Sequence, residues 1–78
     1  MSAASLSAKN FGNLIKTTRK KSGLTQAELA AASGVGARFV RELEQGKPTC
    51  QLEKSLRIAS MLGIKFEAQI PVSLRDKK

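Results

Sequence analysis

The sequence predicts one mainly α-helical domain of four short helices, followed by a single C-terminal β-strand. Apolar residues recur at helical spacing in four stretches, which are separated by residues that typically cap or end helices, such as Thr25 and Gly34. After Gly63 apolar and polar residues alternate, which is typical of a strand. The expected organisation is a flexible tail over 1–7, a helical domain over 8–63, a strand over 64–72 and a flexible basic tail over 73–78.

The first helix is expected over Ala8–Lys21, with Ser7 as its N-cap. One stripe at helical spacing is expected to face the core, and it consists of Phe11, Leu14, Ile15 and Thr18. Gly23 ends this helix.

The second helix begins after Thr25, where Thr25 and Glu28 have the spacing of a capping box. Gly34 follows it, at a position where the chain needs a positive φ that glycine adopts without strain. The third pattern begins after Gly36 and stops at Gln45. Two helices joined by a tight turn with glycine form a helix-turn-helix, whose second helix can lie in the major groove of DNA.

A fourth helix is expected from about Cys50 to Leu62, with Thr49 as its cap and Gly63 just beyond its end. Its apolar face is expected to contain Leu52, Leu56, Ala59 and Leu62, widened by Ile58 and Met61.

The alternating segment after Gly63 poses a pairing problem, because it is the one strand signal in the sequence. Its apolar face consists of Ile64, Phe66, Ala68, Ile70 and Val72, and Pro71 limits its far end. A single strand leaves backbone N–H and C=O groups unpaired. The simplest partner is the same strand of a second copy, paired antiparallel in a homodimer. A strand from another protein, or an extended tail lying over the helices, are the alternatives.

Composition points to a polyanionic partner. The 78 residues carry 14 Lys and Arg against 6 Asp and Glu, for a net charge of +8 and a pI near 10.3. DNA, RNA and an anionic membrane surface all fit this charge. One cysteine cannot form an internal disulfide and suits a reducing compartment. With neither a signal peptide nor a membrane span in the sequence, we expect a cytoplasmic protein that joins the nucleoid when bound to DNA.

The sequence offers little for catalysis. It contains no histidine, so Cys50 has no imidazole to activate it and a typical zinc site cannot form. Glu42 and Glu44 are two residues apart, which points them to different sides of a helix. We expect a non-enzyme without metal or cofactor.

The third helix carries the candidate base-reading residues Ala37, Arg38, Arg41 and Glu42. Arginine pairs with guanine O6 and N7, glutamate accepts from cytosine N4, and alanine touches a thymine methyl group. Either arginine could instead contact phosphate alone. Phe39 could reach a base methyl group or a dimer partner, or fill space under the fourth helix. Gln26, at a helix start, and Lys47 are candidate phosphate contacts.

Residues 11–63 resemble the Xre/Cro helix-turn-helix family of bacterial and phage repressors. The matching motifs are Arg19-Lys20, Gly23-Leu24-Thr25-Gln26, Glu28-Leu29-Ala30, Gly34-Val35, Leu43-Glu44, Gly46-Lys47 and Met61-Leu62-Gly63. The resemblance implies a buried structural ion pair between Arg19 and Glu44. It implies phosphate binding by Gln26, and base reading by Ala37, Arg38 and Glu42. The recognition helix starts at Gly36, where many members have Ser or Thr, so a hydroxyl cap and its possible phosphate contact are missing there.

The expected strand resembles the HipB-like antitoxin branch of this family. That likeness implies a homodimer with paired strands, a palindromic operator, repression of its own operon and binding of a HipA-like kinase toxin. Two alternatives remain open. The chain could be a stand-alone Xre-family regulator without a toxin, or a protein-interaction module without a role on DNA.

Overall fold

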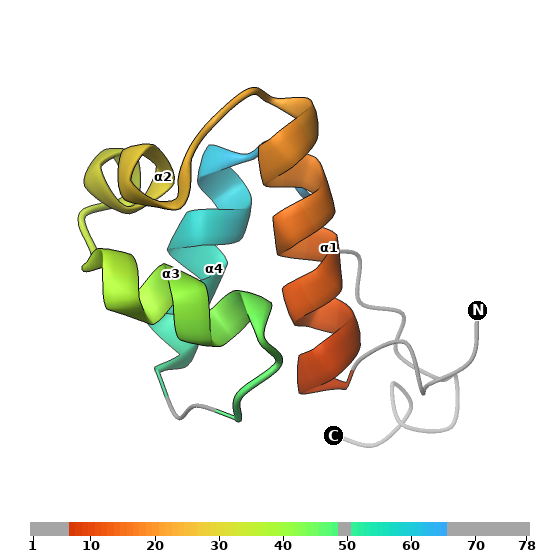
Figure 1. The fold of residues 1–78 in the computed structure, drawn as a ribbon. Coiled ribbons are helices and arrows are strands. Elements are labelled where there is room, and N and C mark those ends of the chain that lie inside the picture. Colours follow the sequence, from red (N-terminus) through yellow and green to blue (C-terminus); the bar gives the residue numbers. More distant parts are fainter. Residues whose placement is uncertain (1–6, 49–50, 66–78) are drawn as a thin grey trace, which may run out of the picture.

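The computed structural model describes residues 7–48 and 51–65, which form four α-helices (Figure 1). The helices are α1 (Ala8–Lys21), α2 (Gln26–Ser33), α3 (Ala37–Glu44) and α4 (Leu52–Met61). Figure 1 shows α3 crossing in front of α4, with α1 beside them and α2 beyond the start of α3. No helix in these ranges is long and apolar enough to cross a membrane.

Local capping explains where the first two helices begin. The Ser7 hydroxyl accepts the backbone N–H of Asn10 at 3.1 Å. The Thr25 hydroxyl accepts the N–H of Glu28 at 3.0 Å, and the Glu28 carboxylate accepts the N–H of Thr25 at 2.8 Å. Gly34 ends α2 with a φ of 71°. The predicted caps at all three positions are confirmed.

The core lies where the four helices meet. Its largest fully buried side chains are Ile15 from α1, Leu29 from α2, Val40 from α3 and Ile58 from α4. Each such side chain stabilises the fold by roughly 1.5–3 kcal/mol. Smaller buried residues complete the cluster, namely Ala30, Leu43 and Ala59.

Gly12 allows α1 to lie directly against the end of α3. A Cβ at this position would overlap the carbonyl oxygen of Leu43 and lie 3.1 Å from that of Glu44. The backbone of α1 therefore touches the backbone of α3, and this contact determines which side of α1 faces inward.

The predicted apolar faces of the first and fourth helices are partly wrong. Leu14 is 44% exposed, Leu52 67%, Leu56 44% and Met61 52%. On α1 the inward side contains Gly12, Ile15 and Arg19, so Leu14 points along a flank. On α4 the inward side contains Ser55, Ile58 and Ala59, which turns the leucines outward.

The fourth helix is shorter than predicted. It begins at Leu52 with Gln51 as its N-cap and ends at Met61. The predicted cap Thr49 and first residue Cys50 lie outside the described residues. Gly63 has the positive φ, 78°, expected just past the helix end.

The predicted strand lies mostly outside the described residues, from Phe66 through Ala68, Ile70 and Val72. Within 7–48 and 51–65 there is no strand. Ile64, its expected first residue, instead packs against the core, and its N–H donates to the carbonyl oxygen of Ala59 at 2.9 Å. Ile64 therefore completes the end of α4.

Candidate nucleic-acid interface

The turn between α2 and α3 holds the two helices in a defined arrangement. The N–H of Val35 donates to the carbonyl oxygen of Ala30 at 3.0 Å, which closes the end of α2. Gly36 then acts as the N-cap of α3 in an extended conformation, with φ −80° and ψ 151°. No side chain caps this helix. Its first backbone N–H groups therefore have no side-chain acceptor, and such groups can bind an external anion.

The outward face of α3 brings the predicted base-reading residues together. Ala37, Arg38 and Arg41 are exposed, and Glu42 is half-buried beside them. Val40, Leu43 and Glu44 face the interior, which holds the helix in place. Gln45 is also exposed, just past the end of α3 and seven residues after Arg38.

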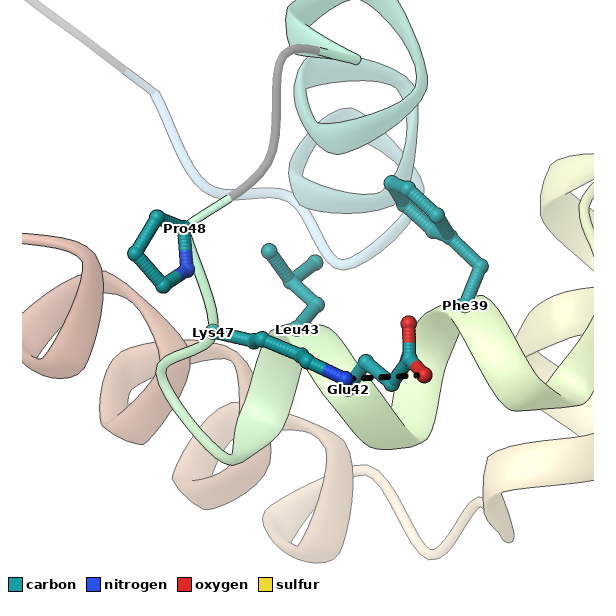
Figure 2. Close-up of a pocket in the computed structure, with 5 residues that line it drawn as sticks. All are labelled: Phe39, Glu42, Leu43, Lys47 and Pro48. Carbon is teal, nitrogen blue, oxygen red and sulfur yellow. Dashed lines mark hydrogen bonds and ion pairs between the residues drawn. The ribbon is translucent and has the colours of Figure 1, made fainter.

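Arg38, Glu42 and Lys47 form a charged cluster on this face. Arg38 Nε lies 3.2 Å from Glu42 Oε2. Lys47 Nζ lies 3.4 Å from the same oxygen, and Figure 2 shows this second ion pair. The hydrogen bond from Arg38, reinforced by Lys47, holds the pKa of Glu42 below its usual range. In this structure the candidate phosphate contact Lys47 is thus held by a carboxylate.

A hollow lies beside the cluster, between the end of α3 and the chain that leads to α4. Its lining residues are Phe39, Glu42, Leu43, Lys47 and Pro48 (Figure 2). Phe39 is half-buried against the core, and Lys54 Nζ of α4 lies 5.7 Å from the centre of its ring. This cation–π geometry places Phe39 between α3 and α4.

Behind α3, a buried ion pair joins Arg19 to Glu44. Arg19 Nε donates to Glu44 Oε2 at 2.6 Å, and a second guanidinium nitrogen donates to Oε1 at 3.0 Å. Arg19 also donates to the carbonyl oxygen of Leu24 at 2.8 Å, and Gln26 Nε2 donates to Glu44 Oε1 at 3.0 Å. The side chain of Gln26, a candidate phosphate contact, therefore binds the buried pair.

Opposing effects set the charge of this pair. Burial raises the pKa of Glu44, but the hydrogen bonds from Arg19 and Gln26, with the charges of Arg19 and Lys16, outweigh it and leave the pKa below its usual range. The hydrogen bond to Glu44 raises the pKa of Arg19. Both groups are therefore charged at neutral pH. No cluster of three or more metal-ligating side chains gathers in the described part of the chain.

Comparisons with known proteins agree with this geometry. The family model described as helix-turn-helix matches residues 15–69. The chain is 42% identical over 62 residues to an uncharacterized HTH-type transcriptional regulator, y4mF, of Sinorhizobium fredii, covering 80% of this chain and 82% of that protein. The crystal structure of the restriction-modification controller protein C.AhdI from Aeromonas hydrophila is similar, with a TM-score of 0.67 and 31% identity over 74% of this chain and 84% of that one.

Proposed function

The chain belongs to the Xre-type helix-turn-helix family, and from this premise we propose that it is a sequence-specific, DNA-binding regulator of transcription. The observation that carries the proposal is the outward face of α3. Two arginines stand exposed there on a helix that the core and a buried ion pair hold in place. A cationic helix on a rigid support fits the major groove of double-stranded DNA.

Each residue of this face has a role in the proposed complex. Arg38, whose side chain is 80% exposed, donates to a guanine edge, and Ala37 lies against a thymine methyl group. Glu42 accepts from a cytosine amino group or holds Arg38 in position, and Arg41 contacts a base or a phosphate. Gln26, Lys47 and the backbone at Gly36 contact phosphates and so position the helix.

The proposed mechanism is repression by a homodimer. Two copies related by a two-fold axis place their α3 helices in successive major grooves, about 34 Å apart, on a palindromic operator. Two exposed apolar side chains one helical turn apart on α4, Leu52 and Leu56, support a second copy. The apolar pattern of residues 64–72 adds a pairing strand to the proposed dimer.

A toxin partner is the finer prediction from the HipB-like resemblance. The two relatives carry the names of a transcriptional regulator and a restriction-modification controller, so they support regulation and give no support to a toxin. A stand-alone regulator fits equally well. The neighbouring gene decides between the two, because an antitoxin of this branch requires an adjacent gene for a HipA-like kinase.

Footprinting on the DNA upstream of the gene tests DNA binding directly. We expect a protected palindrome, and an affinity that falls steeply with salt, by about 0.9 log units per phosphate contact for each log unit of salt. Arg38→Ala should remove the preference for the protected sequence but keep non-specific binding. A flat salt response, with no protected site, would favour a protein-interaction module instead.

A further inference from the structure

The surface of α1 carries positive charge that forms no salt bridge with the described residues. The helix contains five cationic residues and no acidic one. Arg19 is the buried partner of Glu44, and the other four, Lys9, Lys16, Lys20 and Lys21, are exposed. None of these four lysines forms a salt bridge with a described residue.

Three of the four lysines, Lys9, Lys16 and Lys20, lie along one line, which we call the lysine row of α1. At 3.6 residues per turn their positions fall within about 40° of one another around the helix. The row is about 16 Å long at 1.5 Å per residue. Phosphates of one DNA strand follow each other at about 3.4 Å along the helix axis, so the row matches the length of a short run of phosphates.

Two contacts place the start and the middle of the row, Lys9 and Lys16, beside the C-terminal end of α3. Lys9 packs against Gly46, where an added Cβ would lie 2.8 Å from the Lys9 Cα. The charge of Lys16 reaches Glu44, the last residue of α3, and helps to lower its pKa. This part of the row therefore borders residues 44–47, the segment at the end of α3 that carries Gln45 and Lys47.

The placement of these charges costs stability within the protein. Lys9 lies in the first turn of α1, where the helix dipole disfavours a cation. Lys16 and Lys20 are four residues apart, and like charges at that spacing repel each other. The charge of Lys16 stabilises the Glu44 carboxylate. However, Lys9 and Lys20 form no salt bridge with a described residue that would offset these costs. This excess of positive charge points to an anion outside the described part of the chain.

We propose that the lysine row of α1 is a second phosphate-binding surface, which contacts the DNA backbone beside the groove that α3 enters. This inference rests on the proposed function and extends it from the helix-turn-helix to the first helix. The row binds phosphates only, so it adds affinity for any DNA sequence and leaves the choice of sequence to α3.

Single lysine-to-glutamine variants of the full chain test the row. Each removes one charge and keeps a residue of similar helix propensity. The probe is a random-sequence 30-base-pair duplex, with the dissociation constant measured by fluorescence anisotropy over a range of KCl concentrations. Lys9→Gln, Lys16→Gln and Lys20→Gln should each reduce the salt slope by about 0.9 and weaken binding roughly fivefold at 0.15 M salt.

Lys21→Gln is the matched control. It removes the same charge from the same helix, but Lys21 lies about 100° further around α1 than Lys20, so its salt slope should remain that of the wild type. If the wild-type affinity falls steeply with salt and the row variants have the same salt slope, the lysine row does not bind phosphate, but the proposed function stands. A wild-type affinity that does not change with salt contradicts both the lysine row and the proposed DNA binding. Circular dichroism confirms that each variant is folded.

Discussion

Arg19 and Glu44, 25 residues apart in the sequence, are joined by two parallel N–H···O bonds of 2.6 and 3.0 Å. The pair links α1 to the last residue of α3. The carboxylate is 2% exposed and also accepts from Gln26 at the start of α2. One buried charge pair thus fixes the recognition helix against both helices that precede it.

Removing the carboxylate should destabilise the fold strongly. Glu44→Ala leaves the Arg19 guanidinium buried without its partner, which typically costs about 3–5 kcal/mol. Urea unfolding measures the loss. Glu53→Ala is the control, because its exposed pair with Arg57 spans 3.6 Å, and such surface pairs contribute about 0–1 kcal/mol. Equal losses in the two variants would show that the buried pair does not hold the helices together.

Stability should fall in acid, and Glu44 should be one cause. Its pKa in the folded state lies below its usual value, which is about 4.3 in an unfolded chain. The carboxylate therefore stabilises the fold above that usual value, and its contribution is lost as the pH falls through the lower pKa of the folded state. Unfolding free energies at pH 6 and at several points below pH 4.3 measure the loss. Glu44→Gln should be less stable than the wild type at pH 6, but its free energy of unfolding should fall less as the pH is lowered. An equal fall in both proteins would assign the acid sensitivity to other groups.

Gly12→Ala should destabilise the protein, although alanine favours a helix by about 1 kcal/mol. The added methyl group would meet the backbone carbonyl oxygen of Leu43, which has no rotamer to adopt. We expect a net loss of about 1–3 kcal/mol in thermal or urea unfolding. Gly36→Ser is the control, because a Cβ there meets nothing within 4 Å, and a serine N-cap should stabilise α3 by a few tenths of a kcal/mol. A neutral or stabilising Gly12→Ala would contradict the close backbone contact.

Glu42→Gln should weaken the choice of DNA sequence. The carboxylate holds Arg38 at 3.2 Å and Lys47 at 3.4 Å, so its loss frees both cations for phosphates. We expect several-fold tighter binding to a random duplex and a smaller ratio between operator and random affinities, both measured by anisotropy. Glu28→Gln, which removes a carboxylate from the capping box of α2, serves as the charge control. Unchanged affinities for both duplexes in Glu42→Gln would exclude this role.

Leu52→Ser and Leu56→Ser should weaken the proposed dimer. Because Leu52 is 67% and Leu56 44% exposed, their loss should remove less buried surface from the single chain than the loss of a core leucine. Sedimentation equilibrium at micromolar concentration should show the wild type as a dimer and the double variant shifted toward monomer. Ala31→Ser, an exposed change on α2 away from the proposed dimer surface, is the control. A wild type that sediments as a monomer would refute the dimer itself.

Short-range features of the sequence predicted the helices well. The bounds of α1, the capping box at Thr25 and the positive φ at Gly34 all depend on residues within a few positions of one another. The same kind of reasoning predicted that Leu14, Leu52 and Leu56 belong to the core, but the structure leaves all three exposed. A helical apolar pattern covers a broad arc, and residues on its edges are buried only if another helix lies against that edge.

The sequence by itself determined that there are four helices, the caps of α1 and α2, the basic surface of α1 and the residue types on α3. The tertiary structure decided which flank of each helix is buried and which charges are paired. The reason is physical: burial and ion pairing depend on neighbours distant in the sequence. Gly12 brings α1 onto the backbone of α3, and that contact turns Arg19 inward to Glu44 while Leu14 and the lysine row stay at the surface.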